Sequence, residues 1–222
     1  DKIFFYGPYS KYVKKSDNSI IKVLKIMRKY NLISEHYSIK VYKRIPVFSG
    51  LGGGTSNAVT VFKSLVNRKI NNNLLNKIID YVGTDFRIFL NNQGFLKNLK
   101  TVKKFDKKYT LYFLVVYPKI RCSTKQIYSM VKKLAKKNIT YPKKFSSKQA
   151  FLNSITNINN DLQFIVENKY KIISKLIKNI SKEKGCYFSK MTGSGSASYG
   201  LFKDEKSAKV ALNSLRKRYP KF

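Results

Sequence analysis

Ser49-Gly50-Leu51-Gly52-Gly53-Gly54-Thr55-Ser56-Asn57 is the stretch around which the rest of the sequence is organised. It separates two segments of different periodicity. Apolar residues in 37–45 share the parity of one strand face, whereas Ala58, Phe62 and Leu65 recur at the spacing of one helix face. The sequence therefore predicts a strand, a glycine-rich loop and a helix in succession.

Glycines between a strand and a helix suit a loop that binds phosphate groups. A glycine has no Cβ, so backbone amides can approach a bulky anion closely. The start of a helix adds unpaired N–H groups and a partial positive charge. Thr55, Ser56 and Asn57 supply further donors and can cap the helix. A flexible turn before an ordinary capped helix is the alternative interpretation of this stretch taken alone.

Two familiar phosphate loops do not fit the spacing. The Walker A pattern requires Gly-Lys-Ser/Thr, whereas Thr55 follows Gly54, and the dinucleotide pattern requires glycine where Thr55 stands. The longer pattern, from Pro46 to Ala58, resembles the phosphate loop of the GHMP small-molecule kinases. The resemblance implies that ATP is bound by Pro46, Val47, Phe48, Ser49, Gly50, Leu51, Gly52, Gly53, Gly54, Thr55, Ser56 and Asn57.

Other segments resemble motifs of that family in the family's order. Residues 82–90 are similar to the family segment Gly-x-Asp-Val-Pro-Phe-Phe, whose aspartate is the catalytic base. The resemblance implies that role for Asp85, although Arg87 stands where the family usually has proline. A further segment resembles the family's second glycine turn, which is expected beside the first and comprises Thr192, Gly193, Ser194 and Gly195.

Two weaker similarities complete the pattern. Pro118, Thr124 and Tyr128 are similar to a family segment that helps to hold the substrate, but a capping threonine and a half-buried tyrosine would explain the last two residues equally well. Residues 160–162, Asn-Asp-Leu, are similar to a family segment to which we assign a structural role in capping and docking a helix.

The resemblance implies an α+β fold of two units with the site in the cleft between them. Residues 1–106 would form the ATP-binding N-terminal domain, which is related to ribosomal protein S5 domain 2 and is expected to be incomplete. Residues 107–222 would form a ferredoxin-like C-terminal domain. Within these domains, apolar spacing predicts a helix capped by Ser16 or Asp17, a buried strand at 111–116 and one long helix from Asn160 to beyond Ile177.

The resemblance also implies a reaction. The γ-phosphoryl group of ATP, with Mg²⁺, would be transferred to the 2-hydroxyl of a cytidine-diphosphate-linked methylerythritol in non-mevalonate isoprenoid precursor synthesis. The hydroxyl of Ser56 is a possible Mg²⁺ ligand, and the pattern identifies no other. Another GHMP kinase, with a mevalonate-pathway or sugar substrate, and a basic nucleic-acid-binding module are the alternatives.

The charge of the chain bears on the last alternative. The 222 residues include 46 Lys and Arg against 11 Asp and Glu, which gives a net charge of +35. Such a charge is typical of polyanion binders. However, the lysines are scattered singly or in pairs and no zinc-finger or RNP-type pattern is present. The pattern favours solvated helix faces, so no specific nucleic-acid partner is expected.

Cysteine usage and hydropathy predict the compartment. Cys122 and Cys186 are too few and too far apart for a disulfide framework or a zinc site, which favours free thiols in a reducing cytoplasm. No apolar run approaches the length of a transmembrane helix, so no membrane partner is expected.

One family motif is not found. The family carries Pro-x-Lys-x-Asn on its first strand, and its lysine pairs with the catalytic aspartate. Residues 7–12 are only superficially similar, and Lys11 is a poor candidate for this lysine. We therefore expect that residues before Asp1 have been lost and that the chain is inactive, or nearly so, as a kinase, because the transition-state charge would lack its cationic partner.

Overall fold

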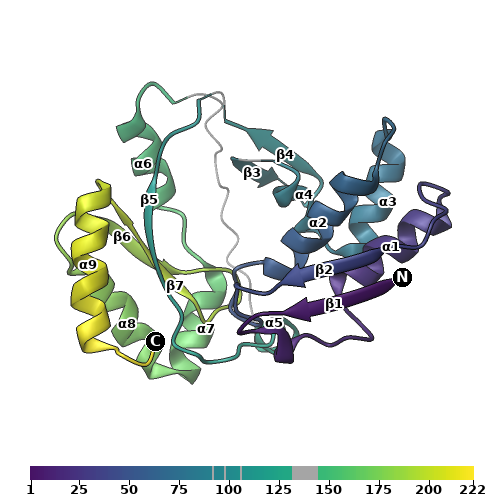
Figure 1. The fold of residues 1–222 in the computed structure, drawn as a ribbon. Coiled ribbons are helices and arrows are strands. Elements are labelled where there is room, and N and C mark those ends of the chain that lie inside the picture. Colours follow the sequence, from purple (N-terminus) through teal and green to yellow (C-terminus); the bar gives the residue numbers. More distant parts are fainter. Residues whose placement is uncertain (92, 98, 106, 132–144) are drawn as a thin grey trace. The chain divides into compact units, whose positions relative to one another are not determined.

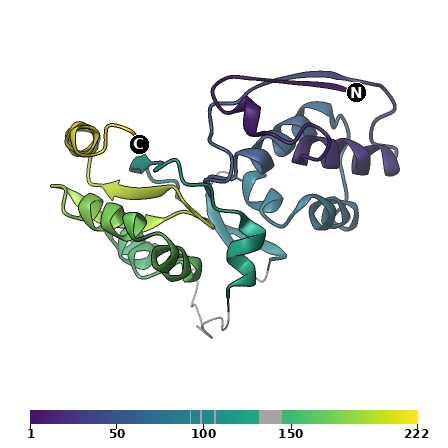
Figure 2. The same cartoon turned by 90° about the horizontal axis from the view of Figure 1, so that it is seen from below.

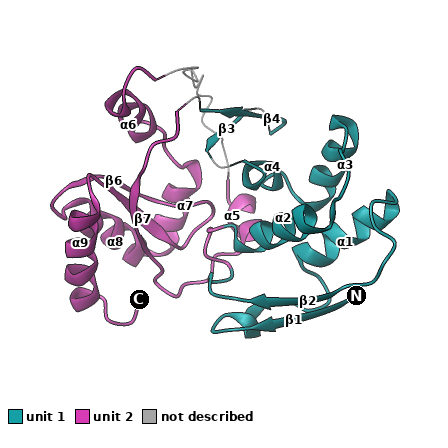
Figure 3. Cartoon of the chain, turned by 45° about the horizontal axis from the view of Figure 1, so that its top comes forward, with its two compact units in different colours: residues 1–47, 52–106 teal, residues 48–51, 107–222 magenta. Residues whose placement is uncertain are grey.

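The structure is a computed structural model that describes residues 1–91, 93–97, 99–105, 107–131 and 145–222. The chain forms two compact units (Figure 3). The first contains residues 1–47 and 52–106, and the second contains residues 48–51 and 107–222. The glycine-rich stretch is thus divided between the units: residues 49–51 belong to the second unit and residues 52–57 to the first.

The first unit combines helices with two small sheets (Figure 1). Its parallel sheet pairs β1 (Lys2–Tyr6) with β2 (Ser38–Tyr42), and its antiparallel hairpin pairs β3 (Gly94–Lys97) with β4 (Thr101–Lys104). The helical elements are the 3₁₀ turn η1 (Ser10–Tyr12), α1 (Ser19–Lys29), α2 (Gly53–Leu65), α3 (Asn72–Val82) and α4 (Phe86–Phe89).

A single apolar cluster holds the helices of the first unit together. Ile20, Val23, Leu24 and Met27 recur at the spacing of one helix face, and this face of α1 is buried there with residues of α2, α3 and α4. The rings of Phe62 and Phe86 meet edge to face with centroids 5.4 Å apart, which joins α2 to α4. Asn18, and neither Ser16 nor Asp17, caps α1, because its side chain accepts the N–H groups of Ile20 and Ile21.

The second unit is built on an antiparallel sheet with the order β5–β7–β6, and Figure 2 shows its helices alongside the sheet. The strands are β5 (Tyr112–Val116), β6 (Cys186–Met191) and β7 (Ser198–Phe202), and the helices are α5 (Thr124–Ser129), α6 (Lys148–Thr156), α7 (Asp161–Lys169), α8 (Lys171–Ser181) and α9 (Glu205–Arg218). Apolar residues of α8 and α9 share one buried cluster with Leu114 and Phe202, so both helices cover the same sheet face.

Two elements of the second unit differ from expectation. The long helix predicted after Asn160 is two helices, because Tyr170 between α7 and α8 leaves the helical conformation, with φ −132° and ψ 87°. The predicted buried strand at 111–116 is only half buried. It lies at an edge of the sheet, where Leu114 is covered by helices while Phe113 and Val115 stay 49% and 47% exposed.

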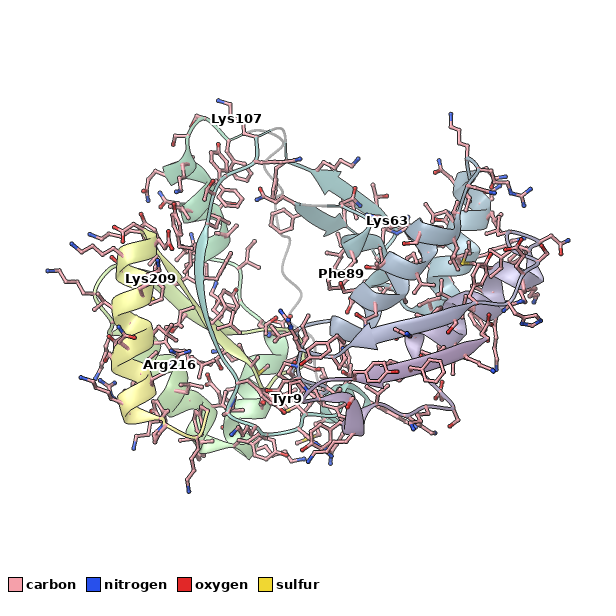
Figure 4. All side chains as sticks on the ribbon, in the orientation of Figure 1. Tyr9, Lys63, Phe89, Lys107, Lys209 and Arg216 are labelled. Atoms are coloured by element: carbon pink, nitrogen blue, oxygen red, sulfur yellow. The ribbon has the colours of Figure 1, made fainter. Side chains whose placement is uncertain are left out.

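The surface of α9 shows how the chain carries its charge. Lys209 and Arg216, both labelled in Figure 4, are exposed residues of this helix. Cys122 and Cys186 are both free thiols. Within the described residues, no helix combines the length and the apolar character needed to cross a lipid bilayer.

Candidate active site

The helix that follows the glycine-rich stretch begins inside the glycines. Gly52 is the N-cap of α2 with φ +65°, and no side chain caps the helix. The prediction that Thr55, Ser56 or Asn57 caps it is therefore wrong, because glycine can take the left-handed conformation that starts the helix earlier. Within the described part of the chain, the backbone N–H groups of Gly53, Gly54 and Thr55 have no acceptor.

One side of this helix start is open and the other is closely packed. A Cβ on Gly54 would meet only Ser19 Oγ, at 3.4 Å, and Gly54 is exposed. A Cβ on Gly52 would lie 2.5 Å from Cζ of Phe89, the last residue of α4. The side chain of Phe89 is shown in Figure 4. The packing fixes the first turn of α2, while its N–H groups remain accessible on the side of Gly54.

Lys43, directly after β2, lies against the same helix start. Its side chain is buried, at 5% exposure, because the residue continues the inward parity of Ile39 and Val41. A Cβ on Gly53 would be 3.0 Å from Lys43 Nζ. Burial lowers the pKa of the Lys43 amine. Sequence analysis missed this residue, although its parity with the inward-facing strand residues was a readable signal.

Asp85, the expected catalytic base, occupies the N-cap position of α4. It is exposed, and its carboxylate has no hydrogen bond or ion pair among the described residues. The two phenylalanines of α4 connect this segment to α2, since Phe86 packs on Phe62 and Phe89 on Gly52. Asp85 is therefore held on the element that supports the start of α2.

Arg87 stands at the position where a proline was expected. Its backbone N–H donates to Thr84 O at 3.2 Å, and its Nη2 donates to Asn76 Oδ1 at 2.7 Å. Proline has no N–H group and could not make the first of these bonds. The arginine thus ties the turn that carries Asp85 to α3.

In the second unit, the first half of the glycine-rich stretch packs against the second glycine turn. The backbone N–H of Ala197 donates to Ser49 O at 2.9 Å, and Thr192 Oγ1 donates to Gly50 O at 3.1 Å. Gly50 has φ +77°, and a Cβ there would lie 2.2 Å from Thr192 O. Only glycine fits this position, so the two glycine segments form one closely packed structure.

Thr124 and Tyr128 lie on α5 of the same unit. Ser123, and not Thr124, caps the helix, because Ser123 Oγ accepts the N–H of Gln126 at 3.5 Å. The Thr124 hydroxyl instead lies 2.9 Å from Ser194 Oγ of the second glycine turn. Tyr128 is 59% exposed. These positions explain Thr124 by a contact with the glycine turn and leave the ring of Tyr128 available to a ligand.

A pocket of about 440 Å³ in the second unit includes Tyr128 and part of the second glycine turn. It is lined by Tyr128, Ile158, Asn159, Asn160, Asp161, Leu162, Lys190, Met191, Thr192, Gly193 and Tyr199. Burial raises the pKa of the Tyr199 hydroxyl and lowers that of the Lys190 amine. The pocket therefore joins an aromatic ring to several polar groups beside the glycine turn.

Asn160 and Lys190 hold the backbone segments that line this pocket by hydrogen bonds to carbonyl groups. Asn160 Nδ2 donates to Met191 O at 3.0 Å and to Gly193 O at 2.8 Å, while its Oδ1 accepts the N–H of Leu162 at 3.1 Å. The Lys190 amine donates to the carbonyl groups of Ile155 and Thr156, the last residues of α6, and of Ile158, just after it. Asn160 thus caps α7 and fixes the second glycine turn at once.

Comparisons with known proteins match both parts of the chain. The family model described as the GHMP kinases N terminal domain matches residues 18–87, and that described as GHMP kinases C terminal matches residues 130–221. The 4-diphosphocytidyl-2-C-methyl-D-erythritol kinase of Pelagibacter ubique is 31% identical over 98% of this chain and 78% of that protein. The kinase of the same name from Caldanaerobacter subterraneus is 29% identical over 99% of this chain and 78% of that protein.

Solved structures share the fold. A crystal structure of 4-(cytidine 5'-diphospho)-2C-methyl-D-erythritol kinase matches 97% of this chain and 78% of that one with a TM-score of 0.60 at 21% identity. A homoserine kinase from Cytophaga hutchinsonii matches 97% of this chain and 76% of that one with a TM-score of 0.60 at 14% identity. At such identities the likeness establishes the fold alone.

Proposed function

We propose, from the premise that this chain belongs to the GHMP kinase family, that it transfers the γ-phosphoryl group of ATP to the 2-hydroxyl of 4-diphosphocytidyl-2-C-methyl-D-erythritol. The acceptor substrate is the one that the relatives' names print, and the kinase of Pelagibacter ubique is 31% identical over nearly the whole chain. Because the reaction joins ATP and an acceptor, the proposal has two parts, a nucleotide site and an acceptor site.

One observation carries the nucleotide site. The glycine start of α2 leaves N–H groups without acceptors and has no side-chain cap. By contrast, side chains cap α1, α3 and α7. A phosphate group would accept these N–H groups and would be stabilised by the positive end of the helix. The nucleotide phosphates would thus take the place of a cap.

Asp85 supplies the proton acceptor of the proposed reaction. The acceptor hydroxyl oxygen would form a bond to the γ-phosphorus as the bond from that phosphorus to the β,γ-bridging oxygen breaks, and the hydroxyl proton would pass to the Asp85 carboxylate. ADP is the leaving group. The exposed carboxylate of Asp85 is free of protein partners in the described chain, so it is available for this proton.

Mg²⁺ is implied by the family chemistry. Among the described residues, no three His, Cys, Asp or Glu side chains come together as a metal site. This fits an ion that is held mainly by nucleotide phosphates and water, as is common for Mg²⁺. Ser56, in the first turn of α2, has a hydroxyl without a protein partner in the described structure and could supply a ligand. The ion would neutralise phosphate charge during transfer.

The acceptor would use the pocket beside the second glycine turn. The exposed ring of Tyr128 offers a stacking surface for a base, and Thr124 adjoins the turn through Ser194. Asn160 keeps the turn in place by its two hydrogen bonds. This division assigns phosphate binding to glycines and substrate binding to side chains of the second unit.

Asp85→Asn tests the proposed base. ATP binding is measured by calorimetry without an acceptor substrate. Turnover is measured separately with 4-diphosphocytidyl-2-C-methyl-D-erythritol, mevalonate and homoserine as acceptors. Because the family's Pro-x-Lys-x-Asn lysine is not found in this chain, we expect slow turnover, and of the first substrate alone. Asp85→Asn should lower it by roughly a further hundred- to ten-thousand-fold and leave ATP binding unchanged. Equal turnover by the variant would reject Asp85 as the base, and turnover of another substrate would reject the proposed acceptor.

A further inference from the structure

One lysine beside the start of α2 is largely buried, and its amine has no protein partner in the described part of the chain. Lys43 is 5% exposed, and its amine has no hydrogen bond or ion pair in the described part of the chain. A lysine amine that leaves water loses its hydration, which is costly unless another group replaces it. The second unit shows the usual solution, since the partly buried Lys190 amine is held by carbonyl groups. Lys43 has no such arrangement.

The surroundings of the amine add a second cost. Lys43 Nζ lies beside Gly53, the first residue of α2, where a Cβ would be only 3.0 Å from the nitrogen and 2.8 Å from a methyl carbon of Ile45. The start of a helix carries a partial positive charge, so an ammonium group there is electrostatically unfavourable. The amine and the unpaired N–H groups of Gly53 and Gly54 are donors of the same sign gathered at one place.

A single kind of ligand removes both costs. An anion with several oxygen atoms can accept the N–H groups of the helix start and a hydrogen bond from the ammonium group together. The open side at Gly54 gives such an anion access, because a Cβ there would meet only Ser19 Oγ. A neutral ligand would leave the charge of Lys43 uncompensated.

We propose that the Lys43 ammonium group binds a phosphate group of the nucleotide at the start of α2. This inference rests on the proposed function, which places a nucleotide there, and adds a residue that the glycine pattern does not contain. Lys43 would recognise the phosphate chain and not the nucleoside. It would do so from the position directly after β2, and its short reach to Gly53 would set where the phosphate lies on the helix start.

The test compares Lys43→Met with Lys40→Met. Lys40 is an exposed lysine of β2, three residues before Lys43, so its replacement removes the same charge without touching the Lys43 amine. Dissociation constants for ATP and for adenosine are measured by calorimetry at about 0.15 M salt, which screens non-specific attraction to the basic surface. We expect Lys43→Met to weaken ATP binding roughly ten- to a hundredfold, to leave adenosine binding unchanged, and Lys40→Met to change neither by more than about twofold.

Thermal unfolding without ligand separates this role from a structural one. The Lys43 side chain is largely buried and its amine has no protein partner in the described chain, so replacing it by an apolar side chain of similar shape should raise the melting temperature of Lys43→Met. If Lys43→Met binds ATP within about twofold of wild type, the role of Lys43 is rejected while the proposed function stands. The same follows if the variant melts at a lower temperature and loses affinity for ATP and adenosine equally. Absence of ATP binding by the wild type would overturn the proposed function and the inference with it. If Lys43→Met does not fold, Lys43→Gln is measured against the same outcomes.

Discussion

Replacing Gly50 by alanine should destabilise the second unit through one added methyl group. Gly50 has φ +77°, and its Cβ would lie 2.2 Å from Thr192 O, 2.9 Å from Gly195 N and 3.1 Å from Gly195 O. All three contacts are backbone atoms, which cannot rotate away as the end of a flexible side chain can. The turn itself must therefore shift, and the bond from Thr192 Oγ1 to Gly50 O would be distorted with it.

The size of the effect follows from two contributions. Holding a residue with a Cβ in the left-handed region costs about 1–2 kcal/mol, and inserting a methyl group into a packed site costs about 1–3 kcal/mol. The free energy of unfolding should thus fall by about 2–5 kcal/mol. For a chain of this size, about 2–4 °C is lost per kcal/mol, so we expect a melting temperature lower by about 4–20 °C.

Gly54→Ala is the matched control. Gly54 also belongs to the glycine-rich stretch, but a Cβ there would meet only Ser19 Oγ at 3.4 Å. Alanine is favoured over glycine within a helix, so the melting temperature should stay level or rise slightly. Both variants are measured by circular dichroism on heating without ligand. A Gly50→Ala protein that melts at the wild-type temperature would refute the packing argument.

One further variant and one alkylation experiment address the second unit. Asn160→Ala removes two bonds to the second glycine turn and the cap of α7, so the free energy of unfolding should fall by about 1–3 kcal/mol; a denaturant midpoint equal to that of wild type would contradict this. Burial raises the pKa of Cys186 from 9.0 to about 11, so at about pH 8 the native thiol should be alkylated about a hundredfold more slowly than in the unfolded chain, and faster as the pH rises towards 11. Peptide mapping by mass spectrometry separates it from Cys122, and equal native and unfolded rates at Cys186 would exclude the raised pKa.

The sequence by itself determined the local features of this chain. The inner face of α1 and the strand before the glycines follow from periodicity, because burial of one face imposes a repeat that is visible in a short window. The order of the glycine stretch, the Asp85 segment and the second glycine turn indicated the GHMP kinase family, and the comparisons confirm that indication. Each of these signals lies within a few consecutive residues.

The tertiary structure decided where the helix after the glycines begins. Sequence patterns placed its cap at Thr55–Asn57, since these side chains can cap a helix. The left-handed Gly52, packed against Phe89, instead starts the helix at Gly53. A contact with a residue far along the chain set this boundary, so the local pattern could not reveal it.

The same reason explains the other differences. The parity of Lys43 with Ile39 and Val41 indicates an inward-facing side chain, but only the tertiary structure shows that its amine lies beside Gly53. The requirement for glycine at position 50 comes from the Thr192 carbonyl, which is more than a hundred residues away. The sequence thus determined which residue types lie in the loop. Long-range packing decided that position 50 must be glycine and that the Lys43 amine lies beside the start of α2. Such contacts between distant residues leave no repeat in the sequence.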